Sequence, residues 1–203
     1  MKVTLLSTLV ASGLALAALS GVAKAEGRLV VYCSATNEMC ESETQAFGEK
    51  YNVKTSFIRN GSGSTLAKVD AEKKNPQADV WYGGTLDPQS QAGEMGLLQP
   101  YKSPNLEQIM EKFRDPAKVK GNLSSAVYVG ILGFGVNTQR LKEKNLPIPK
   151  CWKDLTKPEY KSEIQIADPQ SSGTAYTALA TFVQLWGEDQ AFDYLKQDRK
   201  SVV

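Results

Sequence analysis

The sequence predicts an α/β protein with a mostly parallel sheet that is covered by helices. From residue 26 onward, short apolar stretches of strand length alternate with longer amphipathic stretches. Asn, Asp, Gly and Pro residues separate these stretches at the expected boundaries. The composition, with 41% hydrophobic and 23% charged residues, is that of an ordinary globular protein.

The first part of the chain is expected to alternate three strands with three helices. The predicted strands are residues 29–32, 54–58 and 79–82. The predicted helices are residues 38–51, 64–74 and 87–96. Asn75-Pro76 ends the second helix, and Asp87-Pro88 supplies an N-cap and a first-turn proline for the third.

The second part begins with an extended segment. Residues 125–136, SAVYVGILGFGV, are apolar and rich in β-branched residues and glycine, so we expect them to cross from one lobe to another. The elements expected beyond the crossing are a helix at 139–144, a strand at 163–167, and helices at 173–186 and 188–196. We therefore divide the chain into a first α/β lobe, residues 26–130, and a partial second lobe, residues 131–197.

The N-terminus has the pattern of a secretory signal. A basic start precedes an apolar run over residues 3–22, and Ala23-Lys24-Ala25 forms an A-x-A cleavage site. A membrane anchor is the alternative, but small and polar residues interrupt the run and no basic cluster follows it. We expect residues 1–25 to be removed near Ala25 on export to the periplasm. Residues 198–203 end the chain abruptly, which predicts a non-native tail on a truncated gene.

Charge and composition narrow the class of partner. Removal of Lys2 and Lys24 with the signal lowers 24 basic residues to 22, equal to the 22 acidic residues. A neutral chain without a dense basic run does not indicate a nucleic-acid partner. We therefore expect a partner that is small or that is met through local charge. We also expect a monomer.

The three cysteines indicate disulfide chemistry in an oxidising compartment. Cys33 and Cys40 can pair if a strand turns directly into a helix, which leaves Cys151 over. Two buried thiols and one exposed thiol are the alternative. Because the chain has no histidine and no CxxC pair, we expect no zinc site and no other metal.

Loops of small polar residues follow three of the predicted strands. They are CSATN at 33–37, NGSGST at 60–65 and DPQSSGT at 168–174, and Gly83-Gly84-Thr85, after the strand at 79–82, offers a fourth set of donors. Helix N-termini present unpaired N–H groups and a partial positive charge, so they bind anions without lysine. Helix capping explains each loop taken alone. Together they lie where α/β sheets bind ligands, beyond the carboxyl ends of strands.

The sequence lacks the residues that an enzyme would need for catalysis. Neither Ser62 nor Cys33 has a histidine to activate it, and Gly61-Ser62-Gly63 is shorter than a nucleophile elbow. Asp87 and Asp168 each precede proline, where capping explains them. The glycine-rich loop matches neither GxxxxGK[ST] nor GxGxxG. We expect no catalytic residues and no cofactor.

Several blocks of the sequence resemble a known family. They are LVVYCSATNEMCE, FIRNGSGSTLAKVDAEKKNPQADVWYGGTLDPQ, GILGFGVNT, CWKDL and IQIADPQSSGTAYTALATFVQLWG. They resemble the periplasmic solute-binding proteins that include AfuA-like hexose-phosphate-binding proteins and ferric-ion-binding proteins. The resemblance implies a two-lobed type II periplasmic binding protein fold, incomplete here in its second lobe. It also implies an ABC importer whose permease and ATPase receive the ligand.

The resemblance also implies a ligand site. Its residues are Ser34, Thr36, Ser62, Gly63, Ser64, Gly84, Thr85, Ser172, Gly173 and Thr174. These neutral donors favour a phosphorylated small molecule, hexose phosphate first. Ferric ion is the alternative, although hard Fe(III) prefers anionic oxygen ligands and the chain has no histidine. A phosphonate binder and a secreted hydrolase are weaker alternatives.

Overall fold

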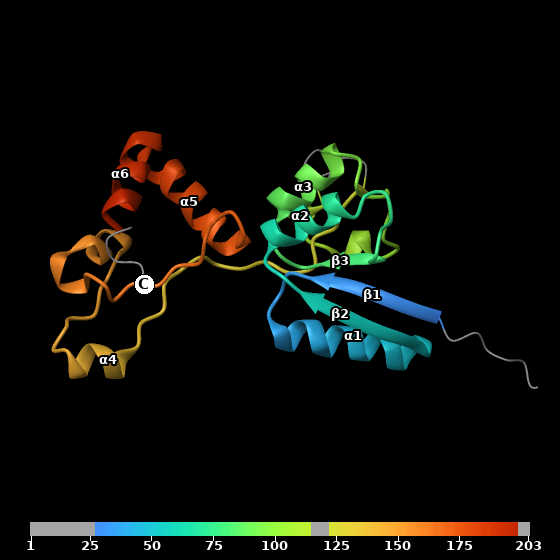
Figure 1. Ribbon diagram of the computed structural model, residues 1–203, viewed down its shortest axis with the longest axis horizontal. Helices are drawn as coiled ribbons and strands as arrows, with labels where there is room; N and C mark the ends of the chain where they lie inside the picture. The colour runs from blue at the N-terminus through green and yellow to red at the C-terminus, as the bar shows by residue number, and fades with distance from the viewer. Residues whose placement is uncertain (1–26, 115–121, 199–203) are drawn as a thin grey trace, which may run out of the picture.

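The computed structural model describes residues 27–114 and 122–198 (Figure 1). The predicted signal, residues 1–25, lies outside these ranges. Of the predicted tail, only Asp198 lies within them, as the last residue of a helix. The described chain forms one half with a parallel sheet and a second half of helices, joined by extended segments (Figure 1).

Three parallel strands form the sheet of the first half. They are β1 (Gly27–Cys33), β2 (Val53–Arg59) and β3 (Val80–Tyr82), in the order β2-β1-β3. The register places Cys33, the last residue of β1, beside the last residues of both neighbours. All three strands therefore end at one edge of the sheet, as the sequence predicts.

Helices cover both faces of this sheet. They are α1 (Asn37–Tyr51), α2 (Ser62–Ala71) and α3 (Leu86–Glu94). Figure 1 shows α1 on one face and α2 and α3 on the other. Because side chains alternate along a strand, Val31 and Cys33 pack with α1, whereas the buried Tyr32 donates a hydrogen bond to Glu72 beyond α2 at 2.7 Å. Burial first, and then this bond, raise the pKa of Tyr32.

Helix starts differ slightly from those predicted. α3 begins at Leu86 with Thr85 as its N-cap, so Asp87 lies in the first turn rather than at the cap. An acidic residue there still favours the helix through its dipole. α2 ends at Ala71, three residues before the predicted end.

A disulfide joins the end of β1 to α1. Cys33 and Cys40 are bonded and fully buried, with 5.9 Å between their Cα atoms. The pairing predicted from the strand-to-helix turn is therefore confirmed. Cys151 is a free, exposed cysteine.

Reduction of this disulfide is expected to lower the free energy of unfolding of the first half by about 2–3 kcal/mol, because the bond restricts a short loop in the unfolded chain. Urea titrations of the oxidised protein and of a Cys33→Ala/Cys40→Ala variant measure the difference. Cys151→Ala serves as the control, since its thiol is exposed and unbonded. Equal stability of oxidised protein and double variant would contradict the expectation.

The second half consists of helices and extended connections. The helices are α4 (Thr138–Glu143), α5 (Gly173–Trp186) and α6 (Glu188–Asp198). Short 3-10 helices are η1 (Leu106–Gln108) and η2 (Glu111–Phe113) in the first half, and η4 (Trp152–Thr156) and η5 (Pro158–Tyr160) in the second.

The predicted strand at 163–167 is wrong for this structure. Only Ile164 forms an isolated bridge, and residues 125–136 also lack helix and strand. A strand needs a neighbour for its backbone and for its cross-strand side-chain pairs. The described part of the second half contains no strand that could be this neighbour.

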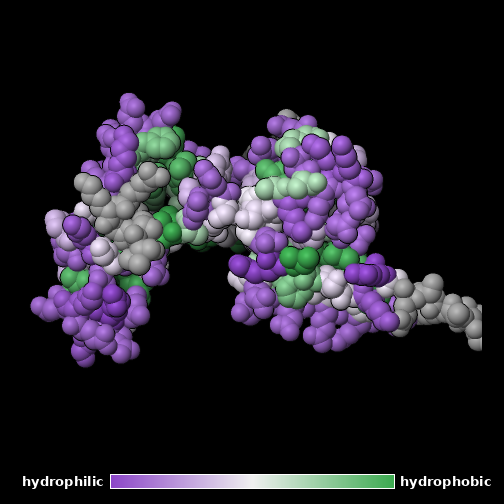
Figure 2. All heavy atoms as spheres, in the orientation of Figure 1, coloured by the Kyte–Doolittle hydropathy of each residue, from purple (hydrophilic) through white to green (hydrophobic). Residues whose placement is uncertain are grey.

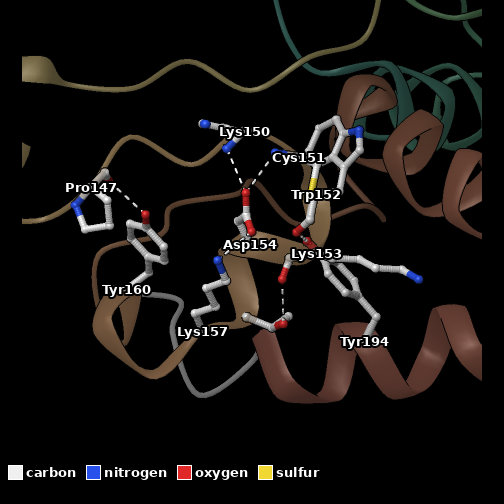
Figure 3. A network of polar contacts seen from close by, with 10 residues as sticks. Pro147, Lys150, Cys151, Trp152, Lys153, Asp154, Lys157, Tyr160 and Tyr194 are labelled. Carbon is white, nitrogen blue, oxygen red and sulfur yellow. Dashed lines mark hydrogen bonds and ion pairs between the residues drawn. The ribbon is translucent and has the colours of Figure 1, made fainter.

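An aromatic cluster forms the core of the second half. Phe182 of α5 is 2% exposed, and its ring lies 5.0–5.1 Å from those of Trp152, Trp186 and Tyr194. Figure 3 shows Tyr194 reaching the η4 backbone, where its hydroxyl donates to the Trp152 carbonyl at 2.7 Å. These contacts fix α5 and α6 against η4.

A polar network stabilises the connection before η4. Asp154 accepts hydrogen bonds from the Lys150 and Cys151 backbone amides at 2.8 and 3.2 Å (Figure 3). It also forms an ion pair with Lys157 at 2.7 Å. The ion pair first, and then the backbone donors, hold the pKa of Asp154 well below its usual range.

Candidate ligand-binding site

The start of α2 lies directly against the loop that precedes α5. The Ser171 carbonyl accepts hydrogen bonds from the backbone amides of Gly63 at 3.1 Å and Ser64 at 3.5 Å. A Cβ atom at Gly61 or Gly63 would collide with the carbonyls of this loop. The two predicted loops therefore converge across the two halves, and glycine permits the close approach.

Hydroxyl groups from the three strand ends gather beside this contact. Ser34 Oγ lies 3.0 Å from Thr65 Oγ1 and accepts a hydrogen bond from Trp81 Nε1 at 3.0 Å. The buried Ser62 Oγ accepts from the Thr85 amide at 3.2 Å. Loops from all three strands thus form one polar cluster, as expected from parallel strands that end at the same edge.

Thr85 carries the one buried side-chain oxygen without a hydrogen-bond partner among the described residues, its Oγ1. A Cβ atom at Gly173 would collide with this hydroxyl, so Thr85 faces the start of α5. A buried hydroxyl without a partner costs free energy, which native proteins avoid unless something else supplies the bond. Thr85 is therefore the most informative side chain of the cluster.

The turn after β3 depends on two glycines and one tyrosine. Gly83 and Gly84 have φ angles of 72° and 90°, which side chains rarely adopt. The Gly84 amide donates to the Tyr128 hydroxyl at 2.7 Å, and Gln89 Nε2 donates to the Gly83 carbonyl at 2.8 Å. The crossing segment thereby holds the third strand-end loop in place.

Most of the predicted site residues lie in this cluster. Those brought together are Ser34, Ser62, Gly63, Ser64, Gly84, Thr85 and Gly173. Ser172 is the N-cap of α5, and its Oγ accepts from the Ala175 amide at 3.3 Å. Thr36 instead caps α1, with its Oγ1 accepting from the Met39 amide at 3.4 Å. Thr174 is exposed and lines a groove of the second half.

The structure also differs from the sequence-based expectation in how the amides are used. Those of Gly63 and Ser64 were expected to face an anion, but they donate to the Ser171 carbonyl. The Gly84 amide is likewise bonded to Tyr128. An anion at the start of α2 must therefore replace a protein carbonyl at these donors. Asp168 accepts from the Gln170 amide at 2.8 Å and so closes a turn before α5, whereas the N-cap of that helix is Ser172.

Sequence reasoning missed four residues at this edge. They are Arg59, Trp81, Tyr128 and Ser171. Arg59 ends β2, and its Nε donates to the Ala35 carbonyl at 3.0 Å, so the site does contain a basic side chain. The position of Arg59 at the end of a predicted strand was the signal that could have identified it. Ser171 acts through its backbone, which residue type does not reveal.

The described residues contain no group of three or more His, Cys, Asp or Glu side chains arranged to hold a metal ion. In the same ranges, none of the helices combines the length and the apolar composition needed to cross a membrane.

This α/β architecture, with polar loops at the strand ends, agrees with the family comparison. Residues 75–203 match the family model described as bacterial extracellular solute-binding protein. The chain therefore belongs to that family.

Individual relatives make the comparison more specific. A Haemophilus influenzae protein described as uncharacterized is 68% identical over 192 residues, which cover 94% of this chain and 55% of that protein. The solved structure of the periplasmic binding protein AfuA from Actinobacillus pleuropneumoniae, with exogenous fructose 6-phosphate bound, is 73% identical with a TM-score of 0.83. The match covers 87% of this chain and 56% of that one.

More distant structures share the fold alone. Iron-bound HitA from Pseudomonas aeruginosa is 21% identical with a TM-score of 0.65, over 87% of this chain and 56% of that one. The fold is that of a type II periplasmic binding protein, with an incomplete second lobe. The chain spans about half the length of the relatives that it matches.

Proposed function

We propose that this chain belongs to the periplasmic substrate-binding component of an ABC importer and that its ligand is a phosphorylated small molecule. The observation that carries this proposal is the partnerless Thr85 hydroxyl, buried where strand-end loops meet the start of α5. A phosphate oxygen is a strong acceptor that would complete this hydrogen bond. The ligand is held without chemistry and passed to a membrane permease and its ATPase.

The contacts of the Ser171 carbonyl support the proposal that the start of α2 binds a hydrogen-bond acceptor. This carbonyl accepts hydrogen bonds from two consecutive amides, those of Gly63 and Ser64, as an oxygen of a bound anion does. A ligand phosphate would take over these donors after the loop withdraws. The helix dipole then favours the ligand more than the carbonyl, because the phosphate carries a full charge.

The start of α5 offers further donors. The amides of Gly173 and Thr174 have no hydrogen-bond partner within residues 27–114 and 122–198. Helix starts leave such amides open to anions. The proposed ligand residues remain the ten predicted from the sequence, with Thr36 the weakest because it caps α1. Arg59 joins them as the basic side chain at the strand ends.

Hexose phosphate is the preferred ligand within this class. The AfuA structure contains fructose 6-phosphate and is 73% identical to this chain. Ferric ion fits less well, because the cluster provides neutral hydroxyls and amides, whereas Fe(III) prefers anionic oxygens. The proposed lobes are residues 26–130 and 131–197, and the proposed location is the periplasm, as for the AfuA relative.

Calorimetric titration with fructose 6-phosphate, glucose 6-phosphate, inorganic phosphate and Fe(III)-citrate tests the proposal. We expect the sugar phosphates to bind and Thr85→Val to weaken them about 10- to 100-fold, the value of a hydrogen bond to a charged group. Thr55→Val is the matched control, because Thr55 lies in β2 beside Gly48, away from the cluster. Binding of iron without sugar phosphate, or equal affinity of both variants, would overturn the proposal.

A further inference from the structure

The turn after β3 brings a tyrosine of the crossing segment to the edge of the hydroxyl cluster. Tyr128 is 43% exposed, and its hydroxyl accepts a hydrogen bond from the Gly84 amide at 2.7 Å. A Cβ atom at Gly84 would lie 2.4 Å from Ser62 Oγ and 2.8 Å from Ser34 Cβ. Gly84 therefore contacts both the tyrosine and the serines of the cluster. Figure 2 shows residues of intermediate hydropathy on the surface at the narrow junction of the two halves.

The proton of the Tyr128 hydroxyl lacks a good acceptor. A phenol can accept one hydrogen bond and donate another at the same time. Among the described residues, the only acceptor within reach of this proton is the Gly84 carbonyl, 3.5 Å from the hydroxyl oxygen, which is long for an O–H···O bond. The bond from the Gly84 amide also polarises the O–H group and makes it a stronger donor. The hydroxyl can therefore donate to an acceptor that approaches this turn.

A second donor without a partner lies beside this hydroxyl. Within residues 27–114 and 122–198, the Ala35 amide donates no hydrogen bond, although Ala35 is only 6% exposed. The Ala35 nitrogen and the Tyr128 hydroxyl each lie 3.2 Å from the position that a Cβ atom at Gly83 would take. They are thus close enough for one phosphate group to accept from both. Because amides of buried residues are rarely left unpaired, this pair of donors indicates that an acceptor binds here.

We propose that Tyr128 is a ligand-binding residue, whose hydroxyl donates to the anionic group of the ligand together with the Ala35 amide. This inference rests on the proposed function, and it adds the crossing segment to the loops that hold the phosphate. Tyr128 belongs to the segment that joins the halves, whereas Ala35 and Gly84 follow strands of the first half (Figure 1). A bound phosphate therefore ties this segment to the sheet.

Removal of the hydroxyl tests the hydrogen bond. We expect Tyr128→Phe to weaken binding of fructose 6-phosphate about 10- to 100-fold in calorimetry, because a hydrogen bond to a charged group is lost. Tyr51→Phe is the matched control, since Tyr51 ends α1, at the end of that helix remote from the strand ends. Unchanged circular dichroism confirms that both variants fold. Equal affinity of Tyr128→Phe and the parent chain would overturn the proposal.

Fluorination separates a direct contact with the ligand from support of the Gly84 turn. Difluorotyrosine in place of Tyr128 keeps the ring and the hydroxyl, but its phenol loses the proton between about pH 7 and about pH 9, below the ordinary tyrosine pKa of about 10. A phenolate cannot donate and repels a phosphate, yet it accepts the Gly84 amide bond more strongly. We therefore expect the affinity for fructose 6-phosphate to fall at least about tenfold across this range in the fluorinated protein and to stay constant in the parent chain. Constant affinity in both would show that Tyr128 only supports the turn, and would overturn the proposal.

The other groups near the hydroxyl keep their charge over this pH range. Burial first, and then electrostatic interactions with Glu43 and Tyr128, raise the pKa of Tyr82, so this neighbouring phenol stays protonated. Arg59, which donates to the Ala35 carbonyl, stays charged. The ligand phosphate is a dianion throughout, because its second pKa is about 6. Failure of the parent chain to bind any sugar phosphate would refute the proposed function and this inference with it, whereas binding that is insensitive to changes at Tyr128 would refute this inference alone.

Discussion

Replacing Phe182 with alanine is expected to lower the free energy of unfolding of the second half by about 3–5 kcal/mol. The ring is almost fully buried and contacts three other aromatic rings, so the truncation leaves a cavity at the junction of α5, α6 and η4. Loss on this scale is comparable to the stability of many whole domains. We therefore expect this half to unfold while the sheet of the first half remains.

The tryptophans allow the two halves to be followed separately. Trp152 and Trp186 report on the aromatic cluster, and Trp81 reports on β3. Urea titrations of single-tryptophan proteins, with and without Phe182→Ala, measure each transition. Phe47→Ala is the matched control, because its ring is 42% exposed on α1. A variant whose second-half transition shifts no more than that of the control would contradict this expectation.

Replacing Gly63 with alanine is expected to separate the start of α2 from the loop before α5. The new Cβ would collide with the Gln170 carbonyl, and relief of the collision breaks the bonds that Ser171 accepts. Two hydrogen bonds at about 0.5–1.5 kcal/mol each are lost. The same amides are the donors that a ligand phosphate would take over from the Ser171 carbonyl, so loss of this contact leaves them open rather than lost to the ligand.

Hydrogen exchange at the Gly63 and Ser64 amides of the parent chain provides the reference for this change. In the variant, the Ser64 amide should exchange faster, because it no longer donates to the Ser171 carbonyl. Gly130→Ala is the control, because no atom lies within 4 Å of the position that its Cβ would take. Unchanged exchange at Ser64 in Gly63→Ala would show that the two halves are not held by this contact.

The first half could be predicted well because its signals are local. Short apolar strands, Asn75-Pro76 and the strand-end glycines specify the alternation that the structure shows. The disulfide follows from the same local geometry, since Cys33 ends β1 and Cys40 lies in the first turns of α1. The convergence of the loops also follows, because parallel strands end at one edge.

The second half was predicted less well because its structure depends on distant partners. The 163–167 stretch has the composition of a strand, but composition does not supply a neighbouring strand. The role of Ser171 was hidden for another reason, since it acts through its carbonyl. Tyr128 was missed because it lies 44 residues from Gly84, whose amide donates a hydrogen bond to the Tyr128 hydroxyl.

The junction between the halves has an evolutionary consequence. Its hydrogen bonds run from the main chain of α2 to the main chain of Ser171, so substitution of Ser171 leaves the acceptor unchanged. Alanine scanning would score that position as unimportant, although its oxygen joins the lobes. Substitution should therefore be tolerated better at Ser171, whose side chain makes one exposed hydrogen bond to the Asp168 carbonyl, than at Gly61 and Gly63, where any side chain is obstructed.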